Sequence, residues 1–169
     1  MKTLTIVALS LAAAPLAAQT GAVAGIGTIY TVAKGNLIKA AEQMSEENYS
    51  FKATPEVRSF GQLVGHVANA NYMFCSMALG EKSPSSTDFE KTTAKAALVQ
   101  GLKDSFTYCD KAYAISDAAA TADVDLFGMK TNKIGVLSFN SGHDMEHYGN
   151  MVTYFRLKGM VPPSSQRGM

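Results

Sequence analysis

Two histidines four residues apart give the clearest chemical signal in this sequence. His143 and His147 fall in an apolar-periodic stretch from about Lys133 to Lys158, and on a helix this spacing places both imidazoles on one face, one turn apart. The only other histidine is His66, on the face of an earlier helical stretch that carries apolar residues. Because three imidazoles can hold a transition metal and leave a position open, we predict that His66, His143 and His147 bind one divalent transition metal.

The spacing has an alternative reading. A pair of histidines at this interval is common, and His66 taken alone is as well explained as a hydrogen-bonded core residue. The distribution favours the metal, because all three histidines stand on two predicted helices and none on a predicted loop.

A protease reading of the same segment can be excluded. Residues 143–147 read H-D-M-E-H and match the H-x-x-E-H pattern of inverted zinc peptidases, in which the glutamate is the general base. Those enzymes take a third, acidic ligand from further downstream, but no Asp or Glu follows His147. Glu146 remains a candidate catalytic residue one turn from His143, where it would either orient a metal-bound water or face solvent.

Four helices must position these residues. Apolar residues recur at three- and four-residue steps, and predict helices over about 24–47, 59–80, 94–116 and 133–158. Ser59 is a suitable N-cap for the second helix and Gly80 a suitable end. We expect a short extended piece near 124–129 and a frayed tail from Ser164 onward. The predicted fold class is an all-α four-helix bundle.

Length and composition bound the function. With 169 residues, 47% of them apolar and 17% charged, the chain suits one folded domain. The formal net charge is +1, with basic and acidic residues interspersed, which disfavours nucleic-acid binding.

The N-terminal residues have the layout of a secretory signal. Lys2 precedes an apolar run from Leu4 to Ala18, which ends in small residues. The run is shorter than the roughly 20 apolar residues that span a bilayer. We therefore expect residues 1–18 to be a cleaved signal peptide and residues 19–169 to be an exported domain, periplasmic or secreted, with no stable membrane association afterwards.

Several positions together resemble a known family. The histidine that follows Gly65 and the later motif resemble the DinB/YfiT-like family of metal-dependent enzymes over nearly the whole mature chain. The later motif consists of His143-x-x-x-His147 with Tyr148, Gly149, Asn150, Tyr154, Arg156 and Pro162-Pro163 after it. The resemblance implies a bundle in up-down-down-up order, with three histidines and water around a metal, often zinc or nickel. It thereby implies the same three ligands, His66, His143 and His147.

The helix order implied by the resemblance bears on the two cysteines. Cys75 and Cys109 lie at matching depths in the second and third predicted helices, and that order makes those helices parallel. An oxidising exterior favours a disulfide. Two separate buried thiols are an equally good reading.

We expect a metal-dependent hydrolase that acts on an unknown small substrate through a metal-bound water, with Glu146 and Asn69 near the ion. A non-catalytic bundle stapled by its metal is one alternative. Transfer to a thiol or amine acceptor is another, although low-molecular-weight thiols are scarce outside the cytoplasm. Exposed apolar helix faces would also allow a homodimer.

Overall fold

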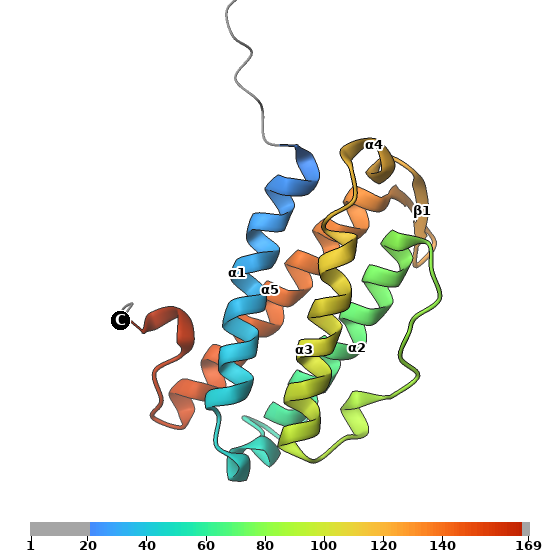
Figure 1. Ribbon diagram of the computed structural model, residues 1–169. Coiled ribbons are helices and arrows are strands. Elements are labelled where there is room, and N and C mark those ends of the chain that lie inside the picture. The colour runs from blue at the N-terminus through green and yellow to red at the C-terminus, as the bar shows by residue number, and fades with distance from the viewer. Residues whose placement is uncertain (1–20, 167–169) are drawn as a thin grey trace, which may run out of the picture.

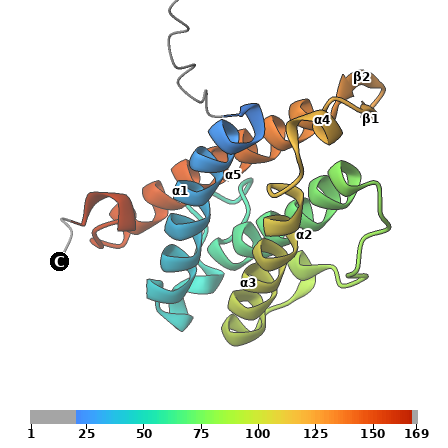
Figure 2. The same cartoon turned by 45° about the horizontal axis from the view of Figure 1, so that its top comes forward.

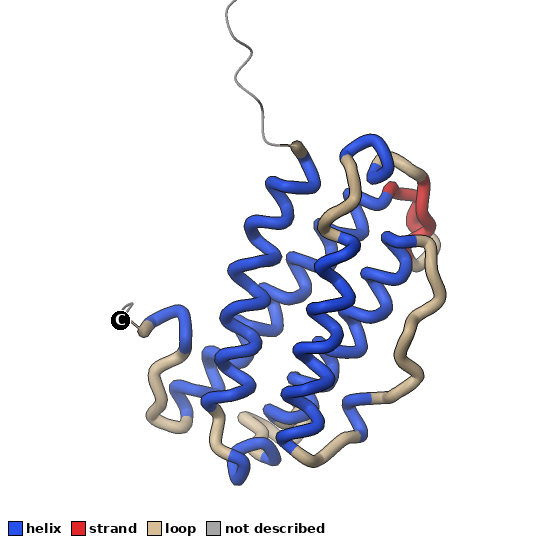
Figure 3. The backbone as a smooth tube through the Cα atoms, viewed as in Figure 1, coloured by secondary structure: helices blue, strands red, loops and turns tan. Residues whose placement is uncertain are grey.

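Four long helices carry most of residues 21–166, the part of the chain that the computed structural model describes. They are α1 (Ala22–Gln43), α2 (Phe60–Leu79), α3 (Lys95–Ala112) and α5 (Lys133–Leu157). In Figure 1, α2 and α3 run parallel to each other and antiparallel to α1 and α5. This is the up-down-down-up order, so the predicted fold class is confirmed. The parallel pair requires the long connection that runs back along the side of the bundle in Figure 3.

The predicted signals at the ends of α2 are confirmed. The Ser59 hydroxyl accepts a hydrogen bond from the backbone N–H of Gln62, and the Gln62 side chain accepts one from the backbone N–H of Ser59. This reciprocal capping box satisfies two N–H groups that a helix start leaves free. Gly80 ends the helix in the left-handed conformation.

Elsewhere the helix bounds differ from the sequence expectation. α1 ends at Gln43 and is followed by the 3₁₀ helix η1 (Glu46–Ser50), while α3 ends at Ala112. The connection from α3 to α5 contains the one-turn helix α4 (Asp117–Ala120), in a segment where the sequence analysis predicted no helix. A single helical turn is too short to produce a detectable apolar period.

A β-hairpin replaces the single extended piece that we expected. Strands β1 (Asp123–Leu126) and β2 (Met129–Asn132) pair antiparallel. Phe127 and Gly128 form the two-residue turn and have positive φ values of 57° and 84°, as primed hairpin turns require. The hairpin and α4 lie together at one end of the bundle (Figure 2).

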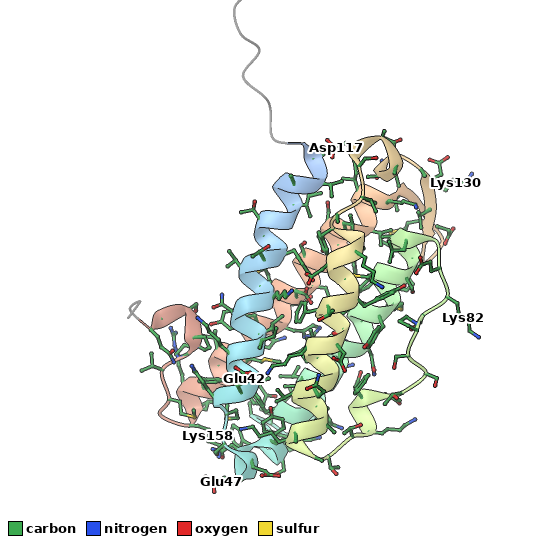
Figure 4. All side chains as sticks on the ribbon, in the orientation of Figure 1. Glu42, Glu47, Lys82, Asp117, Lys130 and Lys158 are labelled. Atoms are coloured by element: carbon green, nitrogen blue, oxygen red, sulfur yellow. A yellow bond between two sulfur atoms is a disulfide. The ribbon has the colours of Figure 1, made fainter. Side chains whose placement is uncertain are left out.

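α1 receives its N-terminal cap from a distant part of the chain. The carboxylate of Asp117 accepts hydrogen bonds of 3.0 Å from the backbone N–H groups of Ala22 and Val23. Figure 4 places Asp117 beside the first turn of α1. A carboxylate at this position also interacts favourably with the helix dipole.

A disulfide joins α2 to α3. Cys75 and Cys109 are bonded, with their Cα atoms 5.2 Å apart, and both side chains are fully buried. The sequence left open a disulfide or two separate buried thiols, and the structure has the disulfide. The matching depth in parallel helices explains it.

The C-terminal segment is packed up to the last described residues. Pro163–Ser165 form the 3₁₀ helix η3, and the backbone N–H of Ser164 donates to the Tyr148 hydroxyl at 2.7 Å. The expected fraying is therefore wrong for residues 164–166. The sequence analysis missed the anchor because Tyr148 gives no sign of its partner.

None of the helices between residues 21 and 166 combines the length and the hydropathy that a membrane crossing requires. The predicted signal peptide, residues 1–18, lies outside the described residues.

Candidate metal centre

The three histidines meet between α2 and α5. Nε2 of His143 lies 3.2 Å from Nε2 of His66 and 3.0 Å from Nε2 of His147. One ligand atom from each of the three lies within 4.8 Å of the others. α2 and α5 are antiparallel neighbours, so His66 faces the consecutive turns of α5 that carry the other two histidines.

These distances suit three nitrogens around one ion. Zinc–nitrogen bonds are about 2.0–2.1 Å long, so two ligands of a tetrahedral site lie about 3.3 Å apart. The observed Nε2–Nε2 separations are close to this value. Neutral imidazoles placed so closely direct nitrogen lone pairs at one another unless a proton or a cation lies between them. The donor set therefore fits a divalent transition metal.

A carboxylate that the sequence analysis missed orients His66. Glu90 Oε1 lies 2.6 Å from His66 Nδ1, and Arg58 Nε donates to Glu90 Oε2 at 3.0 Å. A proton held on Nδ1 by a carboxylate leaves Nε2 with its lone pair free, and this is a common arrangement behind metal-binding histidines. Although burial alone would raise the pKa of Glu90, hydrogen bonds from Arg58 and His66 lower it, so Glu90 stays ionised.

The backbone around Glu90 is fixed against α2. Glu90 belongs to the 3₁₀ helix η2 (Phe89–Lys91). The Asn69 side chain accepts from the backbone N–H of Phe89 and donates to Asp88. Asn69, expected near the ion, holds this segment and also lines a cavity with His66 and His143. A Cβ atom on Gly65 would lie 2.4 Å from the carbonyl oxygen of Phe89, so the glycine before His66 makes room for η2.

The environment keeps the two histidines of α5 neutral. Burial, helped by the nearby His66 and Arg58, lowers the pKa of His143 to about 4. Burial also lowers the pKa of His147 to about 4, with further contributions from His143, His66 and Arg58. A metal ligand must have its lone pair free. Because both rings are already neutral near pH 7, neither has to lose a proton to bind an ion.

Glu146 lies on the exposed side of α5. It lines an open cleft of about 790 Å³, together with Lys52, Arg58, Gln62, His147 and Asn150. The Asn150 amide nitrogen lies 3.4 Å from Nδ1 of His147. Glu146 therefore shares a cavity with one predicted ligand, while its catalytic role stays a prediction.

A buried carboxyl group stands between the two predicted ligands of α5 in sequence. Asp144 is completely buried, and neither of its oxygens has a hydrogen-bond partner within residues 21–166. Burial raises the pKa of Asp144 well above its ordinary value, which favours the neutral acid.

Comparison with known proteins identifies the family. The model of the DinB superfamily matches residues 30–151, which is most of the chain. The chain belongs to the DinB superfamily, as the resemblance predicted.

Individual relatives agree with this assignment. The chain is 27% identical over 127 residues to the uncharacterized protein YjoA of Bacillus subtilis (strain 168), an alignment that covers 70% of this chain and 79% of YjoA. A crystal structure of a DinB-like protein from Bacillus cereus ATCC 10987 is similar with a TM-score of 0.72 at 20% identity, covering 82% of this chain and 94% of that one. The mycothiol-dependent maleylpyruvate isomerase has a TM-score of 0.64 at 16% identity over 76% of this chain and 60% of its own.

Proposed function

We propose that this protein is a metal-dependent enzyme, most simply a hydrolase of a small substrate. One observation carries the proposal: Nε2 of His143 lies 3.2 Å from that of His66 and 3.0 Å from that of His147, and the three rings line cavities, His147 the polar cleft and the other two a second, apolar one. A purely structural metal is usually enclosed by four protein ligands, whereas a catalytic one keeps an open position. Histidines that line open cavities favour a catalytic metal site over a purely structural one that links two helices.

The bound ion would most simply be zinc or nickel. A divalent ion held by three imidazoles can polarise a carbonyl or phosphoryl oxygen and lower the pKa of water. Glu90 fixes the tautomer of His66, and Arg58 keeps Glu90 ionised through their 3.0 Å contact. Glu146, in the cleft beside His147, is the group that we propose accepts a proton from the attacking water. Lys52 and Arg58 line the same cleft and would attract the polar or anionic end of a substrate.

The disulfide supports export. Disulfides persist in oxidising compartments and are rare where glutathione and thioredoxin keep thiols reduced. The buried Cys75–Cys109 bond therefore agrees with a signal peptide over residues 1–18 and a periplasmic or secreted domain over residues 19–169.

A thiol-dependent reaction is a second candidate. It is supported by the fold similarity to a mycothiol-dependent maleylpyruvate isomerase. Export weighs against it, because thiol cosubstrates are scarce outside the cytoplasm. Hydrolysis needs only water.

Metal analysis tests the site. Protein purified without a histidine tag should contain close to one equivalent of a transition metal, and His143→Ala should lose it while keeping the circular dichroism of a helical bundle. Glu146→Gln is the matched control, since it leaves all three ligands in place and should retain the metal. Wild-type protein that binds no stoichiometric metal after incubation with zinc or nickel would end the proposal.

Activity screening tests the reaction. Ester, amide and phosphoester substrates should be hydrolysed by the loaded protein, and a chelator should remove the activity. Glu146→Gln should keep the metal and lose at least about a hundredfold in kcat if it is the general base. A loaded protein that turns over none of these substrates but accelerates transfer to an added thiol would favour the second candidate.

A further inference from the structure

An apolar pocket lies beside the predicted metal ligands, separate from the polar cleft. It has a volume of about 390 Å³, and His66 and His143 are among the residues that line it. The apolar side chains around it are Ala70, Met73 and Phe74 of α2, Phe139 of α5 and Phe127 of the hairpin turn. Small-molecule sites are typically concave, mainly apolar and provided with a few polar groups. This pocket has that composition.

The pocket is built from aromatic rings that contact one another in tilted and edge-to-face arrangements. The ring centroid of Phe74 lies 5.1 Å from that of Phe139 and 6.0 Å from that of Phe127. Phe74 also lies 5.6 Å from the His143 ring in an edge-to-face arrangement. These separations are typical of favourable aromatic contacts, so a further ring entering the pocket would find faces and edges already placed.

Two of these rings are exposed to an unusual degree for phenylalanine. Phe127 is 61% exposed, Phe139 42% and the adjacent Met73 39%. Exposed apolar side chains gathered at one place commonly mark a binding site, whereas single ones do not. They line the same pocket as His66 and His143, which ties this cluster to the candidate metal centre.

The backbone at Phe127 carries a conformational cost. Its φ value is 57°, a region that Gly, Asn and Asp enter readily and that is rare for bulky residues. The residue lies at the tip of the β1–β2 turn, where Asn-Gly would form the same turn more easily. A phenylalanine held in this conformation, and directed at Phe74 rather than at solvent alone, points to a role in binding.

We propose that this pocket binds an aromatic ring of the substrate and that Phe127 is a specificity-determining residue. The proposal rests on the proposed function, because it places the reacting polar group of the substrate at the three histidines. The ring would then lie on the Phe127 side, while polar substituents extend into the cleft of Lys52 and Arg58. The substrate class is therefore an aromatic compound with a polar, hydrolysable or metal-binding group.

Hydroxamates offer probes that differ only in the apolar part. Zinc-loaded protein would be titrated by calorimetry with acetohydroxamate and with benzohydroxamate. Burial of the phenyl ring should make benzohydroxamate at least about tenfold tighter. Phe127→Ser should remove this difference while leaving the affinity for acetohydroxamate unchanged. Ile29→Ser is the matched control, since Ile29 is also exposed (53%) but lies on α1.

A second measurement does not depend on the ion. In protein labelled with ¹³C at methionine methyl groups, benzyl alcohol added to the metal-free form should shift the Met73 signal in the wild type and in Ile29→Ser, but not in Phe127→Ser. If zinc fails to bind and the Met73 shift is still seen, the pocket is supported and the metal proposal alone fails. If zinc and acetohydroxamate bind but neither aromatic probe shifts Met73, the pocket proposal is overturned. A dimer in light scattering that dissociates in Phe127→Ser would overturn it too, because a second copy would then cover these rings.

Discussion

Replacing Gly65 with alanine should damage both the stability of the fold and the affinity for the metal. The added Cβ would lie 2.4 Å from the carbonyl oxygen of Phe89, 2.5 Å from its carbonyl carbon and 2.8 Å from the backbone nitrogen of Glu90. All three atoms are backbone, so the methyl group cannot be accommodated by turning a side chain. The η2 segment would have to move away from α2 by about 1 Å to restore ordinary contacts.

The size of the effect follows from two opposing terms. Overpacking in a well-packed region costs about 1–3 kcal/mol, and the better helix propensity of alanine returns up to about 1 kcal/mol. We therefore expect Gly65→Ala to lower the free energy of unfolding by up to about 2 kcal/mol. The same movement would lengthen the 2.6 Å contact between Glu90 and His66, and loss of such a carboxylate partner weakens metal binding about 10–100-fold.

Gly142→Ala is the matched control for this substitution. Gly142 is an exposed residue inside α5, and a Cβ there would meet nothing within 4 Å. This variant should gain up to about 1 kcal/mol from helix propensity. Urea denaturation of the metal-free proteins and a competition titration with a zinc chelator would measure both quantities. Gly65→Ala with the stability of Gly142→Ala and with wild-type zinc affinity would refute the contact between α2 and η2.

Three further predictions concern the disulfide, the carboxylate behind His66 and the titration of the site. The Cys75–Cys109 disulfide closes a loop with a sequence separation of 34. Its reduction should lower the free energy of unfolding by about 4 kcal/mol on the chain-entropy model. Equal urea midpoints with and without reductant would contradict this. Glu90→Gln should weaken zinc binding about 10–100-fold in a chelator competition, whereas a change below about twofold would leave Glu90 without a positioning role. The pKa of His143 and of His147 is lowered to about 4 in the folded protein, from an ordinary 6.5. As the pH falls, the unfolded chain therefore takes up protons on these rings before the folded one does. The metal-free protein should lose stability as the pH falls from about 6.5 towards 4. Each histidine can change the free energy of unfolding by at most about 1.4 kcal/mol per pH unit, and by less where solvent screens it. Urea midpoints that stay constant over this range would show that the rings are not shielded from solvent.

The sequence predicted the features that depend on local spacing. The pair His143 and His147 needs only the helical repeat to share a face, and the limits of α2 follow from a capping serine and a terminal glycine. Helix periodicity located the four long helices because each extends over several turns. The order of the helices came from the family resemblance, since apolar spacing does not distinguish one bundle topology from another.

The parts that escaped prediction depend on contacts between distant segments. Glu90 is 24 residues from His66, and it reaches that ring only because Gly65 lets η2 approach α2. Asp117 caps α1 from a separation of 95 residues. Phe127 lies in a turn without the usual Asn-Gly signal. In each case the residue type is ordinary, and its role appears only when the packed helices bring its partner alongside.

The bond between Cys75 and Cys109 has a consequence for how the bundle would open. α2 is fixed to α3 covalently, and an ion bound as we propose would tie α2 to α5 as well. α1 would then be the one long helix of residues 21–166 without such a cross-link. It is held by packing and by non-covalent contacts, among them the Asp117 cap, the Tyr30 hydrogen bond to Phe106 and the ion pairs Lys34–Asp110 and Glu42–Lys103. Local unfolding follows the route with the fewest strong constraints, so amide hydrogens of α1 should exchange with solvent before those of α2. The helix that follows the predicted signal peptide would thus be the first to detach and the last to dock, while the three cross-linked helices keep the histidines together.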